Sequence, residues 1–192
     1  MIKIEDVPLL YTTKQFIQTI PTIEYKEKYI NLETTMAACM ECPNFSKNWA
    51  CPEFKEDVLE YWDKYDNIEL TLTKIIFTKE ALNNSYNEDD LMIIVENSLF
   101  RERNKLIKSL EEKEAELNGK CLSAGFCGYC ERCSRIDGKP CKYPDKCHNS
   151  IESIGGLVGD TLSGVFNEEI KWIDIKKGKL PENLSLLMGV LY

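Results

Sequence analysis

Cysteine is the residue type that most constrains this chain. All nine cysteines lie in two short segments, 39–51 and 121–147, and the long stretch between them contains none. Nine is an odd number, so the cysteines cannot all pair in intramolecular disulfides. The N-terminal residues MIKIEDVPLLYTTKQ contain no basic stretch followed by an apolar one, as a secretory signal would. We therefore expect a cytoplasmic protein whose reduced cysteines bind metal.

The composition limits the remaining classes of protein. The chain has 192 residues, 43% of them hydrophobic, which is enough for a real core, and we predict one domain over residues 1–192. Its formal net charge of -8 argues against binding to nucleic acid, which normally requires a basic surface. The sequence has no stretch of 18 or more apolar residues, so we expect no conventional membrane span.

Hydrophobic periodicity predicts a mixture of helices and strands. Leucine, isoleucine and valine recur at helical spacing after Asn87, a capping residue followed by three acids, and the pattern stops at Gly119. The predicted helices are 55–65, 88–118 and a glycine-interrupted 151–166; the predicted strands are 68–78, 170–175 and 184–191, with further strand material before the first cysteine segment. We predict an α+β fold in which helices pack on a small sheet and the two cysteine segments meet at metal or cluster sites.

The second cysteine segment carries the strongest motif. Cys127, Cys130 and Cys133 form a C-x2-C-x2-C run, which in ferredoxins supplies three ligands of a cubane cluster. Cys141, followed by Pro144, is the candidate for the delayed fourth ligand. We interpret this run as a 4Fe-4S site. Zinc and reduced structural thiols are the alternatives.

The first cysteine segment is incomplete by itself. Cys39 and Cys42 are followed by Cys51, and three donors can hold part of a cluster or of a zinc site, but both usually need four. The candidates for the missing donor are Cys121, Cys147, Cys141 by crossover and, as a weaker one, His148. The alternative is that Cys39 and Cys42 are a bystander pair.

Two sequence blocks resemble a known family. The blocks CMECPNFSKNWACPEF and GFCGYCERCSRIDGKPCKYPDK, with a following Ser-x-Glu, are similar to a prokaryotic family of unknown function whose members are predicted metal-binding proteins. The resemblance spans roughly residues 37–160 and implies no established reaction. It implies metal or cluster binding at seven positions: Cys39, Cys42, Cys51, Cys127, Cys130, Cys133 and Cys141.

The chain departs from the family pattern in two ways. Cys121 and Cys147 have no counterpart in it, and Leu157 stands where the family has an aspartate. Four plus three family cysteines suggest one complete cluster and one with an open corner. We expect either Cys121 or Cys147 to close the second cluster, leaving the ninth cysteine free.

Three functions from different classes follow. The first is electron transfer by one or two 4Fe-4S clusters, with a redox protein as partner. The second is an enzyme, or an enzyme subunit, in which an open iron binds a small oxyacid or thiol. The third is a zinc-stabilised interaction module.

Other motifs narrow the choice. Nucleotide-binding glycine motifs are missing, and so is the C-x3-C-x2-C spacing of radical S-adenosylmethionine enzymes. The single histidine, His148, which we expect to be exposed in a loop, makes a Ser-His-Asp hydrolase improbable. We predict no catalytic residue. Basic residues in both segments could dock an acidic redox partner or offset the charge of a cluster: Lys47, Arg132, Arg135, Lys139, Lys142 and Lys146.

Overall fold

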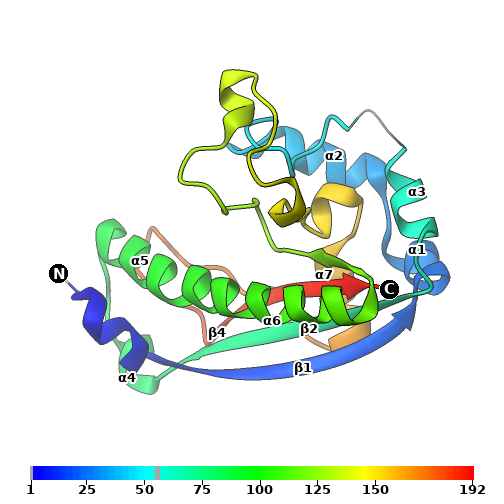
Figure 1. Cartoon of the computed structure of the whole chain (residues 1–192). Helices are drawn as coiled ribbons and strands as arrows, with labels where there is room; N and C mark the ends of the chain where they lie inside the picture. Colours follow the sequence, from blue (N-terminus) through cyan, green and yellow to red (C-terminus); the bar gives the residue numbers. More distant parts are fainter. Residues whose placement is uncertain (1, 55–56) are drawn as a thin grey trace.

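The computed structural model describes residues 2–54 and 57–192, which form a four-stranded antiparallel sheet with helices on both faces (Figure 1). The strands lie in the order β1 (Tyr11–Pro21), β2 (Asn67–Phe77), β4 (Asn183–Leu191) and β3 (Lys120–Leu122). β1 and β2 pair along their whole length, with Tyr11 opposite Phe77 and Pro21 opposite Asn67. This arrangement confirms the predicted α+β class.

The two inner strands are covered on both faces. In β4, Leu187 faces one layer of helices, while Leu186 and Met188 face the other, because successive side chains of a strand point to opposite faces. The strand predicted over 68–78 is confirmed as β2. Its expected half-buried pattern is wrong, since Thr71 and Thr73 are each only 2% exposed.

One face of the sheet is covered by a long helical segment. It runs as α5 (Glu88–Val95), a π-helical turn η2 (Glu96–Phe100) and α6 (Arg101–Leu117) (Figure 1). The Asn87 side chain caps its start by accepting a hydrogen bond from the Asp90 amide, and Asn118, with φ of 50°, ends it. The helix predicted over 88–118 is therefore confirmed, with one π turn inside it.

The charged second half of this segment packs against the sheet. Leu110 is buried beside β4, and Lys113 forms an ion pair with Glu69 of β2. The charged residues therefore lie on a part of the helix that packs on the sheet.

The other face is covered by α1 (Thr22–Tyr29), α3 (Val58–Asp63) and α7 (Val158–Phe166). The Trp62 ring stacks on Tyr25 with ring centroids 5.2 Å apart. Its indole nitrogen donates a hydrogen bond of 2.8 Å to the carbonyl of Ile154, in the 3-10 helix η5 (Glu152–Ile154). The core of this layer is thus joined to the segment that follows the second cysteine segment.

Three predicted elements have different outcomes. The strand predicted over 184–191 is confirmed as β4, and the helix over 55–65 is confirmed for Val58–Asp63; Lys55 and Glu56 lie outside the described residues. The helix over 151–166 is split into η5 and α7. Gly155 lies between them with φ of 96°, a conformation that favours glycine, and a Cβ there would lie 2.6 Å from Leu32.

The strand predicted over 170–175 is wrong. The segment is irregular and makes one isolated bridge, between Asp174 and Lys179. None of residues 170–175 is buried, and Trp172 is 79% exposed, so the segment lacks the buried face that would hold it against the sheet. The remaining short helices are η1 (Ile4–Leu9), α2 (Leu32–Met40), α4 (Lys79–Asn83), η3 (Ser134–Asp137) and η4 (Pro144–Lys146).

The two cysteine segments lie side by side beyond one edge of the sheet. The chain leaves the sheet after β3 and returns to the same place, where Ser123 forms a parallel bridge with Ser150 and its amide donates to the Asn149 carbonyl at 2.8 Å. The resulting loop stands beside α2, which leads into the first cysteine segment (Figure 1).

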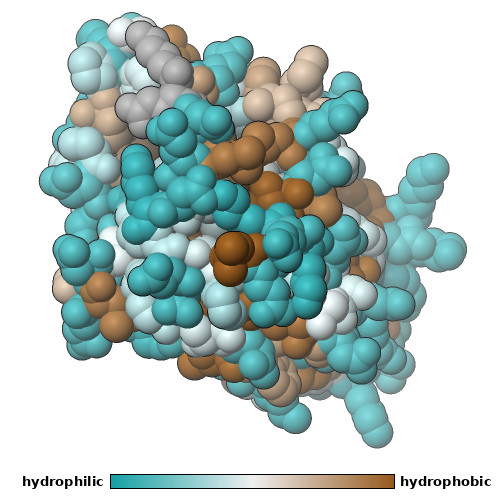
Figure 2. Space-filling model, turned by 90° about the vertical axis from the view of Figure 1, so that its right-hand side faces the viewer, coloured by the Kyte–Doolittle hydropathy of each residue, from teal (hydrophilic) through white to brown (hydrophobic). Residues whose placement is uncertain are grey.

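The face of the molecule seen at the right of Figure 1 is mainly hydrophilic. Hydrophobic side chains appear there in small areas between hydrophilic ones (Figure 2). Among the described residues, no helix has both the length and the apolar character needed to cross a bilayer.

Candidate metal centres

The first and second cysteine segments are joined by direct hydrogen bonds. The Arg135 guanidinium donates to the carbonyls of Asn48 at 2.8 Å and Cys51 at 3.2 Å. It also lies over the ring of Trp49, 5.3 Å from the centroid, and the Trp49 indole nitrogen donates to the Lys139 carbonyl at 3.1 Å. The segments therefore meet, as the sequence predicts.

Arg103 of α6 fixes the start of the second segment. It is 5% exposed, and its guanidinium donates to the carbonyls of Ala124 at 2.9 Å, Cys127 at 2.8 Å and Phe126, and to the hydroxyl of Ser123 at 3.2 Å. Charge-assisted bonds to carbonyls are stronger than neutral ones, so this buried group holds the loop backbone against the helix.

Five cysteines of the second segment line one cavity. The cavity measures about 200 Å³ and is also bordered by Trp49, Phe126, Tyr129 and Tyr143. Tyr129 and Tyr143 pack edge to face, with ring centroids 5.1 Å apart. The five cysteines are Cys127, Cys130, Cys133, Cys141 and Cys147.

Cys127 has the environment of a thiolate. A hydrogen bond from the Cys147 thiol, opposed by burial and supported by the backbone amides of Tyr129 and His148, lowers the pKa of Cys127 to about 6. The same contact, together with burial and the neighbouring Cys141, raises the pKa of Cys147. These three thiols are therefore close neighbours.

This donor set fits a thiophilic metal group. Thiolates are the preferred ligands of iron–sulfur clusters and are common ligands of zinc, and five thiols around one cavity exceed the four that either needs. The sequence predicts that either Cys121 or Cys147 completes the site of the first segment; Cys147 lies with Cys127 and Cys141, and neither Cys121 nor Cys147 lines the cavity of the first segment.

The first cysteine segment surrounds a second and larger cavity, of about 920 Å³, lined by Cys39, Cys42 and Cys51. The Cys42 amide donates to the Cys39 carbonyl at 3.0 Å, which brings these two residues together after α2. Asn48 donates to the Cys51 sulfur at 2.9 Å. Burial raises the pKa of both Cys39 and Cys51, although the hydrogen bond from Asn48 opposes this at Cys51.

Glu152 of η5 lines the same cavity. Its Oε2 atom is buried and has no hydrogen-bond partner among the described residues, and burial raises the pKa of its carboxyl. The charge of Glu152 also contributes to raising the pKa of Cys39. Glu152 was not among the predicted site residues, although it belongs to the Ser150-x-Glu152 pattern that the chain shares with the family it resembles.

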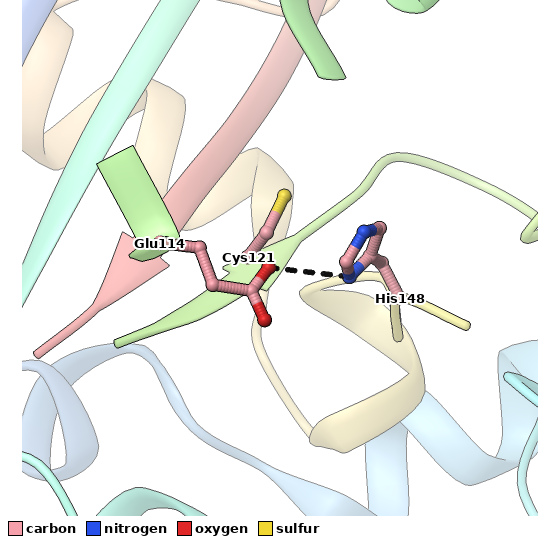
Figure 3. A group of neighbouring side chains, drawn as sticks. All are labelled: Glu114, Cys121 and His148. Atoms are coloured by element: carbon pink, nitrogen blue, oxygen red, sulfur yellow. Dashed lines mark ion pairs between the residues drawn. The ribbon is translucent and has the colours of Figure 1, made fainter. Parts of the chain in front are cut away.

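Cys121 lies apart, in a third group with Glu114 and His148 (Figure 3). Each of the three offers one ligand atom, and these atoms all lie within 4.8 Å of one another. His148 is 1% exposed, so the expectation of an exposed loop histidine is wrong. The cause is α6, whose Glu111 and Glu114 side chains face the imidazole ring.

Comparison with known proteins gives one match. A family model described as "Predicted metal-binding protein (DUF2284)" matches residues 23–191. Searches of curated proteins and of solved structures gave no significant match.

Proposed function

The chain belongs to the DUF2284 family of predicted metal-binding proteins, and we propose that the metal is iron. In this proposal the iron is held as two 4Fe-4S clusters in a cytoplasmic electron-transfer protein. The observation that carries this proposal is the set of five cysteines around one cavity, next to three cysteines around another. Phe126 and Asn44 line both cavities, so the two centres are neighbours.

In this proposal, Cys127, Cys130 and Cys133 ligate the first cluster together with Cys141 or Cys147. A bound cluster supplies one-electron oxidation and reduction. Arg103 positions the Cys127 backbone, and the aromatic side chains around the cavity limit the access of water, which tunes the reduction potential.

The partner in this proposal is an acidic redox protein. Three of the basic residues in the two segments have carboxylate partners: Arg132 with Asp137, Arg135 with Glu53, and Lys146 with Glu111. Lys47, Lys139 and Lys142 are exposed. Lys47 lines the smaller cavity, and Lys142 lies in the chain between Cys141 and Tyr143, which also line it, so a partner could approach there to exchange electrons.

The test is anaerobic purification with analysis of iron, sulfide and zinc. Wild-type protein should contain about eight irons per chain. Cys130→Ser and Cys42→Ser, one from each segment, should each lose one cluster and keep the other. Stoichiometric zinc with no iron or sulfide after anaerobic reconstitution would instead support the zinc-stabilised module and end the iron–sulfur proposal.

The larger cavity favours a second candidate function, an enzyme with an open site at the first segment. Three cysteines and Glu152 line a space of about 920 Å³, which is large enough for a small molecule. In this candidate, Cys39, Cys42 and Cys51 hold the metal group, and a small oxyacid or thiol occupies the remaining position beside Glu152.

The two functions are separated by adding cyanide or a small thiol to the Cys130→Ser variant, in which only the cluster of the first segment remains. A changed electron paramagnetic resonance spectrum supports the open site. An unchanged spectrum contradicts it and leaves electron transfer.

A further inference from the structure

The group formed by Glu114, Cys121 and His148 lies between three elements. Glu114 comes from the last turns of α6, Cys121 from β3, and His148 from the chain that returns to the sheet (Figure 3). Cys121 is fully buried and His148 is 1% exposed. Both functional groups are therefore removed from bulk water, where an unpaired polar atom is costly.

The hydrogen bonds of His148 leave one ring nitrogen without a partner. Nε2 lies 3.0 Å from Glu111 Oε1. A carboxylate only accepts, so Nε2 carries the hydrogen. Nδ1 is buried without a hydrogen-bond partner among the described residues, and it lies 3.6 Å from Glu114 Oε2. Glu114 Oε1 pairs with Lys120 at 3.3 Å, which leaves Oε2 facing the ring. The contact in Figure 3 is an ion pair when the ring carries a second proton; in the neutral ring, the Nδ1 lone pair faces a carboxylate oxygen, and a metal ion between them would satisfy both atoms.

The surroundings of Cys121 keep its thiol neutral unless a cation binds. Burial, followed by the charges of Glu114 and Glu111, raises the pKa of Cys121 to about 12, although Lys120 and Arg103 oppose this. The Tyr61 hydroxyl is another buried group without a hydrogen-bond partner in the described part of the chain. Burial raises its pKa most, and Glu114 and Cys121 contribute, which places it near the same group.

We propose that Glu114, Cys121 and His148 bind a divalent zinc ion at a third metal centre, separate from the two cysteine-lined cavities. Thiolate, imidazole and carboxylate are all common zinc ligands. A thiolate and a carboxylate balance the two positive charges of the ion, and a water molecule takes the fourth position of the tetrahedral site. Glu111, which accepts from the far nitrogen of His148, is the outer carboxylate that orients a metal-bound imidazole.

The position of this centre gives it a structural role. It joins α6 to β3 and to the end of the second cysteine segment, so one ion would fasten the base of that segment to the sheet and the long helix. This proposal does not depend on iron in either cavity.

The experiment measures zinc and iron together in the full chain and its variants. Wild-type protein should bind about one zinc per chain in addition to any iron, and X-ray absorption at the zinc edge should show one sulfur at about 2.3 Å with nitrogen or oxygen ligands at about 2.0–2.2 Å. Glu114→Gln and Cys121→Ser should lose this zinc and keep their iron. Glu116→Gln, a change at an exposed residue close by on α6, should keep both.

A second variant tests the outer carboxylate. Glu111→Ala should lower zinc affinity roughly 10–100-fold without changing the ligands seen at the zinc edge. If Cys121→Ser does not fold, the zinc-edge spectrum of the wild type and the zinc content of Glu114→Gln still test the proposed site. A sulfur-only zinc shell, zinc retained in Glu114→Gln, or a doubly protonated His148 in zinc-treated protein by nitrogen NMR would each overturn the proposal.

Discussion

Replacing Arg103 with methionine should loosen the second cysteine segment. The guanidinium makes four hydrogen bonds to that segment, three of them to backbone carbonyls, from a side chain that is 5% exposed. Methionine replaces the aliphatic part of the side chain, but it is shorter by the end of the guanidinium group and can donate no hydrogen bond. The carbonyls of Ala124, Phe126 and Cys127 then lose their donor.

The magnitude follows from the number of bonds. A hydrogen bond to a charged group contributes about 1.5–3 kcal/mol, and the lower value for three carbonyls gives about 4.5 kcal/mol. Water that reaches the freed carbonyls, and the avoided burial of a charge, reduce this to about 3 kcal/mol. That is a large part of the roughly 5–15 kcal/mol that stabilises a typical domain.

Urea unfolding of the metal-free, reduced protein measures the change in free energy, and iron content after anaerobic reconstitution measures the effect on the site. Arg101→Met, at an exposed position on the same helix, is the control and should change stability by about 0.5 kcal/mol or less. Arg103→Lys should fall between the two, because it keeps the charge but has fewer directed donors. A loss below 1 kcal/mol in Arg103→Met, with normal iron content, would refute the anchoring role.

Three further predictions concern the two cysteine segments. In metal-free reduced protein, the rate of Cys127 alkylation should rise with pH with a midpoint near pH 6, because the Cys147 thiol lowers the Cys127 pKa to about 6. The midpoint should shift to higher pH in Cys147→Ala, and a midpoint above pH 8 in the wild type contradicts this prediction. Arg135→Lys should increase amide hydrogen exchange in the first cysteine segment, measured by mass spectrometry, because Arg135 donates to the backbone of that segment. Arg132→Lys, which changes an exposed ion pair, should leave the exchange unchanged. Equal exchange in the two variants excludes a role for Arg135 in joining the two segments. In metal-free protein, Glu152→Gln should gain stability over wild type as the pH rises above about 4.5 in urea unfolding. Burial raises the carboxyl pKa, so above that pH the folded wild type still holds a proton that the unfolded chain has released, and its stability falls with rising pH until the folded carboxyl ionises as well; a constant difference would contradict the burial of this group.

Local patterns were enough to predict the long helix and two of the strands. The helix over 88–118 and the strands over 68–78 and 184–191 have strong periodicity and clear ends, and all three are present. The segment 170–175 has the same alternating character but stays outside the sheet. Whether such a segment joins a sheet depends on whether one of its faces is buried by the rest of the fold, and none of residues 170–175 is buried.

The same limit applies to the sites. The C-x2-C-x2-C run predicted a shared site for Cys127, Cys130 and Cys133, because ligands close together in sequence stay close in any fold. Cys121 and His148 carried no such signal. They form a group with Glu114, which lies on α6, a separate element of the fold. Only the packing of α6 beside β3 brings the three residues together.

The π-helical turn at Glu96–Phe100 makes the long helix sensitive to the number of its residues. Such a turn holds one residue more than an α-helical turn, and each residue of an α-helix adds about 100° of rotation. Deleting one residue there would give a more regular helix but turn everything after it by about that angle. Arg103 would then face away from the cysteine segment, and Glu111 and Glu114 away from His148. An insertion or deletion at this point should therefore disrupt the metal centres far more than one in an exposed loop, although the turn itself supplies no metal ligand.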